Sequence, residues 1–344
     1  MSSIKVVNPI EFPTWDSLLE TSDQTTFFHT AAWAKVLSES YGYKPLYFTT
    51  IENGQLAGLI PVMEIDSFLT GKRGVSLPFT DLCNPIARGP DVFARLFEAV
   101  IAHGRKAGWK SLDIRGGKAF LEKEPAAAQL VVHTLALNPE EADVSKAFRD
   151  STYRNIRKAQ KEGVTVNLEH SSAAMASFYR LHCETRRHHG LPPQPWSFFD
   201  KIQEHIIAKG NGFVAMAVYQ GQSVSGAIFF NFNGATIFKY GASDKTFQHL
   251  RPNNLLLWQA IEWCSESGFR SFHFGRTEPE NGGLLQFKDG WGVTKAGLCY
   301  YKYDLGKDRF LSNNSGPKSS YRVFKMMPAP LLRLTGNLLY KHVG

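Results

Sequence analysis

The sequence lacks any uninterrupted apolar run of about 18 residues, the length that a transmembrane helix needs. Its first residues, MSSIKVVNPIEF, contain no apolar run after a basic start, which argues against a secretory signal. No heptad repeat of apolar residues is present, so no coiled-coil arm is expected. These absences together predict a globular protein of the cytoplasm.

Cysteine is also scarce. The chain has four cysteines, Cys83, Cys183, Cys264 and Cys299. They are widely spaced and form no CxxC pair, whereas zinc sites and disulfide frameworks depend on close or regularly spaced cysteines. We therefore expect four small, buried thiols in a reducing compartment.

The bulk composition is that of a two-domain enzyme. A chain of 344 residues is longer than a single core usually holds. It is 43% hydrophobic and 20% charged, and its aromatic content of 13% favours pockets that stack on flat or sugar-like ligands. The formal net charge is +8, and from Lys307 onward seven Lys/Arg stand against one acid. This basic tail predicts an anionic neighbour such as lipid headgroups, a nucleotide or RNA, or else a solvated surface.

A long internal repeat predicts the domain organisation. The segments 99–114 and 259–274, AVIAHGRKAGWKSLDI and QAIEWCSESGFRSFHF, each indicate an amphipathic helix, a Gly C-cap and a strand. Upstream, each copy has a Gly-containing hairpin turn between two strands, at Gly54 and at Gly221. The repeat is too long for a solenoid. We expect two related domains, 1–138 and 139–305, joined where a new helix opens at Pro139, and a basic tail at 306–344.

The helix predicted after the first domain carries a positive face. In STYRNIRKAQKEGVTV, Arg154, Arg157, Lys158 and Lys161 follow the spacing i, i+3, i+4, i+7 and share one face. Like charges so close repel one another, so an anionic ligand or an RNA backbone is expected there. Acidic neighbours from elsewhere in the fold are the alternative.

The segment GRTEPENGGLLQFKDGWG, residues 275–292, carries the candidate reaction centre. Attack of an amine on an ester or thioester passes through an oxyanion, and a preorganised cation at that oxygen is typically worth about 3–4 kcal/mol. Lys288 follows an apolar stretch that shields the methylene chain of its side chain from water. The predicted Gly-rich turn around it permits close approach of the backbone to a ligand. Arg276 lies just past a predicted strand, where a guanidinium can grip phosphate or carboxylate. Ion pairs that only pin the loop are the alternative for both.

A third candidate cluster lies in TRRHHGLPPQPWSFF. Arg187 and His188 are candidates for binding anionic groups of an acceptor, Trp196 is a candidate for stacking, and Tyr240 is added as a further substrate-binding candidate. No metal site is expected, because the two adjacent histidines have no third ligand at a suitable spacing. A Pro-rich surface connection is the alternative interpretation.

Taken together, FFHTAAWAKVL (27–37), RNIRKAQKEGV (154–164) and FGRT…GLLQFKDGWG (274–292) resemble the FemAB family. The resemblance is strongest to FemAB-like proteins associated with exopolysaccharide and PEP-CTERM export and to BioF2-like acetyltransferases. It implies an α+β fold of two tandem GNAT-like (GCN5-related N-acetyltransferase) domains with mixed β-sheets flanked by helices. It also implies transfer of an acyl or aminoacyl group onto an amine of a cell-wall, peptidoglycan or exopolysaccharide precursor. Lys288, preceded by Phe287, matches the lysine thought to stabilise charge at the reacting carbonyl.

Departures from the family pattern affect donor and acceptor. GNAT enzymes cradle the pyrophosphate of coenzyme A in an Arg/Gln-x-x-Gly-x-Gly/Ala loop. Here FQHLRPNNLL keeps Arg251 but has Pro252 and Asn253 where glycines are expected. We therefore expect no bound cofactor, and aminoacyl-tRNA rather than acyl-CoA as the leading co-substrate. Leu37 stands where peptidoglycan-acting members carry a lysine, which places a nucleotide-muropeptide acceptor in doubt.

Alternative functions remain open at this point. One is an acyl-CoA-dependent N-acetyltransferase acting on an amino sugar. Another, of a different class, is a non-catalytic module that binds a glycan precursor or RNA. The tail has Leu331, Leu334 and Leu338 on one helical stripe, so it either packs on the first domain or lies on the inner face of a membrane.

Overall fold

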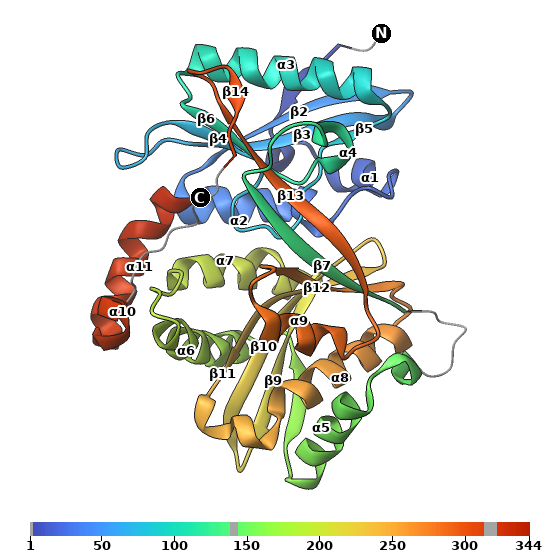
Figure 1. Cartoon of the computed structure of the whole chain (residues 1–344), viewed down its shortest axis with the longest axis vertical. Helices are drawn as coiled ribbons and strands as arrows, with labels where there is room; N and C mark the ends of the chain where they lie inside the picture. Colours follow the sequence, from blue (N-terminus) through green and yellow to red (C-terminus); the bar gives the residue numbers. More distant parts are fainter. Residues whose placement is uncertain (1–2, 138–143, 313–321) are drawn as a thin grey trace. The chain divides into compact units, whose positions relative to one another are not determined.

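The computed structural model describes residues 3–137, 144–312 and 322–344. The chain divides into two compact units (Figure 1). Unit 1 comprises residues 1–130, 297–318 and 338–344, and unit 2 comprises residues 131–296 and 319–337. The predicted join at residues 138–139 and the helix expected to open at Pro139 lie outside the described residues.

Unit 1 is a mixed sheet with helices. Its elements are β1 (Lys5–Val7), α1 (Trp15–Glu20), α2 (Ala31–Tyr41), β2 (Lys44–Glu52), β3 (Gln55–Ile65), β4 (Arg73–Val75), β5 (Ile86–Ala87), α3 (Pro90–Ala107), β6 (Ser111–Arg115), α4 (Lys118–Leu121) and β14 (Arg309–Phe310). The strand order is β1-β2-β3-β4-β6-β13, where β13 is Thr294–Asp304. Most neighbours are antiparallel, but β4 and β6 run parallel. The predicted mixed sheet is confirmed in this unit.

Helix α3 covers this sheet for reasons that the sequence contains (Figure 1). Pro90 occupies its first turn, where the missing N–H is harmless, and Gly108 ends it in the left-handed region at φ 76°. The buried face includes Leu96 and Val100, which join the apolar core formed with β2 and β3. Gly58 lets the helix approach closely, because a Cβ there would lie 2.7 Å from a Leu96 methyl carbon.

The strands of unit 2 have helices on both faces. Its elements are α5 (Asp150–Lys161), β8 (Thr165–Glu169), α6 (Ser172–His188), α7 (Trp196–His205), β9 (Gly212–Tyr219), β10 (Gln222–Phe232), β11 (Ala235–Ser243), α8 (Pro252–Glu266), β12 (Ser271–Thr277), α9 (Gly282–Asp289) and α10 (Arg322–Met326). The strand order is β7-β12-β11-β10-β9-β8, where β7 is Ala128–Ala136. Only β11 and β12 are parallel.

Strand β10 is buried on both faces, which explains its apolar sequence. Ala227 and Phe229 belong to the core that includes α8 and α5. Gly226 lies on the opposite face, where a Cβ would meet the Phe178 ring of α6 at 3.1 Å. Alternate residues of a strand point to opposite faces, so one strand supplies both cores. The helices α5 and α8 thus cover one face, and α6 covers the other.

The predicted repeat is present in both units. The helix and strand pairs α3–β6 and α8–β12 correspond, and each helix begins with proline and is followed by a left-handed glycine. The predicted hairpins β2–β3 and β9–β10 are also present. Their two-residue turns, Asn53-Gly54 and Gln220-Gly221, have positive φ at both positions, as the hairpin twist favours.

The division of the chain differs from the predicted domain ends. We expected the second domain to continue to residue 305, but the later part of β13 pairs with β6 of unit 1, with Tyr301 opposite Ile114. The tail is also divided. Helix α11 (Ala329–Val343) begins in unit 2, whereas residues 338–344 belong to unit 1. There the Tyr43 hydroxyl donates to the Tyr340 carbonyl at 3.0 Å, and Arg73 donates to the His342 carbonyl at 2.9 Å.

The four cysteines are unbridged, and Cys83, Cys183 and Cys264 are buried. Within the described ranges, no helix combines the length and the apolar character that a membrane crossing requires.

Candidate functional site

Lys288 lies near the end of a short helix, and its ammonium is buried. We expected a Gly-rich turn, but residues 282–289 form α9, whose first N–H groups are capped by the side chain of Asn281. Lys288 is 3% exposed. Its Nζ donates to the backbone carbonyls of Gly275 and Arg276 at 3.3 and 3.1 Å. The helix forms because LLQFKD has good helix formers between two breaks, Asn281 and Gly290.

The structure therefore brings together the three predicted catalytic residues. Arg276 meets Lys288 through its main chain, and its side chain is partly buried. Phe287 is partly buried and packs edge-on against Trp291, with ring centroids 6.1 Å apart. The Phe287 ring thus holds α9 on the core, while the neighbouring lysine faces the end of β12.

Two groups that the sequence analysis missed stand beside Lys288. His133 of β7 is 0% exposed, and its Nε2 lies 3.6 Å from Asp289 Oδ1. Burial first, and then the charge of Lys288, lowers the pKa of His133, although Asp289 opposes this shift. The imidazole is consequently neutral near pH 7. The other carboxylate oxygen of Asp289 accepts a hydrogen bond from Lys295 at 3.1 Å.

Several buried polar atoms near α9 have no hydrogen-bond partner among the described residues. They are both ring nitrogens of His133, Thr277 Oγ1, Asp289 Oδ1 and Trp291 Nε1. Thr277 and Trp291 are fully buried. Proteins satisfy almost all buried polar groups, so a group of unsatisfied ones calls for an explanation. Their concentration at β7, the end of β12 and α9 is typical of a site that works on a polar ligand.

The residues just before the motif RNIRKA are joined directly to the motif FKDGWG. The backbone N–H of Arg149 and the hydroxyl of Thr152 both donate to the Gly290 carbonyl, at 3.0 and 2.9 Å. Gly290 is required at this approach, because a Cβ there would lie 2.5 Å from Thr152 Oγ1. Phe148 stacks edge-on against Trp291 at 5.0 Å. The start of α5 and the end of α9 are therefore held as one assembly.

The positive face of α5 is directed away from this assembly. Thr152, Ile156 and Ala159 form the buried face of α5. The predicted anion-binding residues Arg154, Arg157 and Lys158 are exposed. None of these three forms an ion pair with another described residue, so the acidic neighbours of the alternative interpretation are not found there.

Strands β11 and β12 separate after a short parallel contact. They pair only over residues 235–237 and 271–273, whereas β12 pairs with β7 along its length, from Ser271 to Thr277, with a bulge between His273 and Arg276. Helix α8 begins after β11, with Arg251 as its N-cap at φ 61°. A left-handed conformation is costly for arginine and natural for glycine. Arg251, the residue of the coenzyme A loop pattern that this chain retains, thus holds a left-handed backbone at the start of α8.

An aromatic cluster surrounds Tyr240 near the end of β11. Its ring contacts His182 and Phe199, with centroids 6.2 and 5.5 Å away, and its hydroxyl lies 3.4 Å from the amide of Gln194. Burial lowers the pKa of His182 to about 3, so this imidazole is also neutral. The predicted residue Tyr240 is therefore partly buried in a packed cluster.

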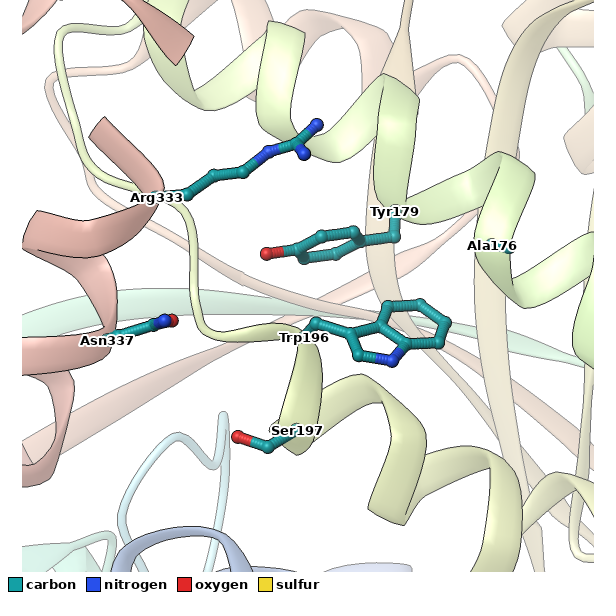
Figure 2. Close-up of a pocket in the computed structure, with 6 residues that line it drawn as sticks. All are labelled: Ala176, Tyr179, Trp196, Ser197, Arg333 and Asn337. Atoms are coloured by element: carbon teal, nitrogen blue, oxygen red, sulfur yellow. The ribbon is translucent and has the colours of Figure 1, made fainter. Parts of the chain in front are cut away.

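The remaining predicted residues lie on α6 and α7. Arg187 and His188 are exposed at the C-terminal end of α6. Trp196 is 38% exposed at the start of α7. It lines an open pocket together with Tyr179 of α6 and Arg333 of α11 (Figure 2). This pocket is formed within unit 2 alone.

Comparisons with known proteins agree with this geometry. Residues 146–289 match the acetyltransferase (GNAT) domain family.

Solved structures with a similar fold include FemX. The TM-score is 0.68 at 12% identity, and the match covers 89% of this chain and 98% of FemX. A tandem GNAT protein from the clavulanic acid biosynthesis pathway has a TM-score of 0.56 and 11% identity, covering 89% of this chain and 99% of its own. L-PGS from Bacillus licheniformis has a TM-score of 0.53 and 13% identity, covering 93% of this chain and 95% of its own. No curated protein sequence matches the chain. The predicted α+β fold of two GNAT-like domains is confirmed.

Proposed function

We propose that the chain is an acyltransferase that acylates an amine of a cell-wall or exopolysaccharide precursor. The match of residues 146–289 to the GNAT acetyltransferase domain family and the similarity of the fold to FemX support this proposal. The group transferred is an acyl or aminoacyl group carried by an ester or thioester donor. The observation that supports this proposal most directly is the buried Lys288 ammonium at the end of β12, among polar groups without partners.

Lys288 supplies the charge for the proposed step. The amine nitrogen forms a bond to the donor carbonyl carbon, and the carbonyl oxygen becomes an oxyanion. The carbonyl then re-forms as its bond to the ester oxygen or thioester sulfur breaks, and the leaving group takes up the proton that the amine nitrogen loses. A cation fixed by two carbonyls needs no reorganisation when that oxyanion appears. His133 and Asp289 act as positioning residues in this scheme, since the buried His133 of β7 lies 3.6 Å from Asp289, the residue that follows Lys288 on α9.

The charged side chains suggest an anionic acceptor or donor. Arg276, Arg187 and the α5 residues Arg154, Arg157 and Lys158 supply guanidinium and ammonium groups, and the α5 set has no acidic partner among the described residues. Phosphate and carboxylate are the groups that such side chains recognise. This supports a phosphate-bearing donor, which both acyl-CoA and aminoacyl-tRNA provide.

The donor is assigned to acyl-CoA in this proposal, contrary to the preference drawn from the loop sequence. The loop lacks glycines, but residues 146–289 match the GNAT acetyltransferase domain family, whose usual donor is acyl-CoA. Aminoacyl-tRNA remains the second candidate because the exposed positive face of α5 suits a nucleic-acid backbone.

A transfer assay decides among these donors. Wild type is supplied with acetyl-CoA or with aminoacyl-tRNA and with a glucosamine-containing acceptor, and both the leaving group and the acylated amine are measured. Turnover with acetyl-CoA supports the assignment, and turnover with aminoacyl-tRNA alone overturns the donor. We expect Lys288→Met to lower kcat by about 10²–10³-fold, the usual effect of losing an oxyanion donor. Lys209→Met, at an exposed position of the same unit, is the matched control.

Two results would contradict acyl transfer. Full activity of Lys288→Met would remove Lys288 from the reaction. Saturable binding of acceptor without transfer from either donor would indicate the non-catalytic binding module.

Contact with a membrane surface is a separate part of the proposal. On α11, Leu331, Leu334 and Leu338 are 49%, 53% and 57% exposed. No acidic residue occurs after Asp308, so the leucines stand in a purely basic segment. An apolar stripe with neighbouring cations suits an anionic bilayer. We expect the protein to float with phosphatidylglycerol vesicles but not with phosphatidylcholine vesicles, and Leu334→Ser to lose this binding. Equal flotation with both vesicles, or unchanged flotation of the variant, would contradict the contact.

A further inference from the structure

The pocket beside α11 has polar groups that converge on one space. It has a volume of about 620 Å³ and is lined by residues of three helices: Ala176, Tyr179, Trp196, Ser197, Arg333 and Asn337. Figure 2 shows the Tyr179 ring between the Arg333 guanidinium and the Trp196 indole. The Asn337 amide and the Ser197 hydroxyl point into the same space from opposite sides (Figure 2). A volume of this size accommodates a ligand of one or two sugar rings.

The pocket has an uncompensated positive charge. Arg333 lies over the Tyr179 ring, 5.7 Å from its centroid, and no described carboxylate pairs with it. The surrounding segment 322–344 contains no Asp or Glu. A guanidinium that is fixed on an aromatic ring and has no acidic partner is a preformed site for carboxylate or phosphate.

The aromatic side chains add an apolar wall. Trp196 is 38% exposed and packs edge-on against Tyr179, with centroids 5.1 Å apart. The Tyr179 hydroxyl donates its one proton to the Gln194 carbonyl at 3.2 Å. Its oxygen can therefore only accept a hydrogen bond from a ligand in the pocket. Ser197 and Asn337 offer both donors and acceptors. This combination suits a ligand with an apolar ring face and many hydroxyl groups.

We propose that this pocket binds an acidic sugar unit, a pyranose that carries a carboxylate or a phosphate. Arg333 receives the anionic group, Trp196 stacks on the ring, and Ser197 and Asn337 bond to its hydroxyls. Neither a neutral sugar nor a bare anion uses all of these groups. The inference deepens the proposed function, because it names the chemical class of the glycan acceptor and rests on that function for its biological meaning. Binding itself requires no donor and no Lys288.

The test follows the indole N–H resonance of Trp196 in ¹⁵N-labelled protein, assigned with Trp196→Phe. Glucuronate, glucose 1-phosphate, glucose and inorganic phosphate are titrated separately in the absence of any donor. We expect saturable shifts of the Trp196 resonance with at least one of the two acidic sugars, and none for the fully buried indoles of Trp33 and Trp291. The stronger of the two identifies carboxylate or phosphate as the anionic group.

Substitutions distinguish specific binding in this pocket from non-specific attraction of anionic sugars to a positively charged protein. Arg333→Gln should weaken acidic-sugar binding at least tenfold, since it removes a charge-assisted pair. Asn337→Asp should also weaken it, because it brings a negative charge into the pocket. Lys209→Gln removes one charge at an exposed position that does not line the pocket and should leave the affinity unchanged.

Three outcomes would overturn the proposal. The first is the absence of a Trp196 shift at tens of millimolar acidic sugar. The second is inorganic phosphate binding as tightly as glucose 1-phosphate while glucuronate fails to bind, which would make the pocket a simple anion site. The third is an affinity that does not change in Arg333→Gln. Because no transfer is measured, failure here leaves the acyltransferase proposal intact, and failure of the transfer assay leaves this binding result intact.

Discussion

The stability of unit 2 should depend on pH through one buried histidine. His182 is 4% exposed and lies among Phe178, Phe199 and Tyr240, with ring centroids 4.9–6.2 Å away. Burial first, and then the charge of Arg186, lowers its pKa to about 3. In the unfolded chain the pKa of a histidine is about 6.5. Between these two values the unfolded state holds a proton that the folded state does not.

The sign and size of the effect follow from this difference. Because the folded-state pKa lies below the unfolded one, the free energy of unfolding falls as the pH falls through 6.5. At pH 5 this one group should cost about 2 kcal/mol relative to pH 7. The value at pH 5 is set by the unfolded pKa, since the folded pKa lies well below 5 and contributes little there.

Urea denaturation of His182→Phe tests the argument. The substitution keeps a ring in the aromatic cluster and removes the titrating group. We expect the loss of unfolding free energy between pH 7 and pH 5 to be smaller in the variant than in wild type by about 2 kcal/mol. His188→Phe, at an exposed position of the same helix, is the control and should behave as wild type. An identical loss in His182→Phe and wild type would refute the reasoning.

Other predictions concern the reaction centre and the thiols. Gly290→Ala should lower the free energy of unfolding by about 1–3 kcal/mol, because its Cβ would overlap Thr152 Oγ1, and unchanged urea denaturation would contradict this. His133→Gln should lower kcat with little change in KM in the wild-type background but cause no further loss in Lys288→Met, whereas additive losses would show that His133 does not act through Lys288. Burial raises the pKa of the Cys264 thiol to about 12, so the native protein should react with a thiol reagent at no more than Cys299 and show four thiols in urea; rapid native labelling of Cys264 would contradict this.

Local sequence features predicted much of the fold because local chemistry determines them. Proline at the first turn and glycine after the last turn set the ends of α3, and the turn Gln220-Gly221 set the β9–β10 hairpin. Helix α9 was missed because its two glycines suggested a turn, whereas the Asn281 cap and the packing of Phe287 stabilise a helix. Propensity is a weak guide where packing contributes most of the stability.

Long-range contacts were beyond the reach of the sequence. Lys288 and Arg276 were each predicted from their local sequence, but the contact of Lys288 with two main-chain carbonyls depends on how α9 folds back on β12. His133 lies more than 150 residues before Asp289 in the chain, and a single valine-rich strand, QLVVHTLA, gave no reason to select it. The pocket beside Trp196 likewise requires Arg333 from α11, which is brought there only by tertiary packing.

Unit 1 is built from three separate stretches of the chain, so it cannot be completed until late in synthesis. Unit 1 holds residues 1–130 but also needs β13, whose Tyr303 pairs with Leu112 of β6. During synthesis, the continuous stretch 131–296 of unit 2 emerges before that strand does. Strand β6 of residues 1–130 therefore lacks its β13 partner until residues 300–304 have left the ribosome. A stop codon at Gly297 would thus leave residues 131–296 in place but remove from the N-terminal unit the strand that pairs with β6.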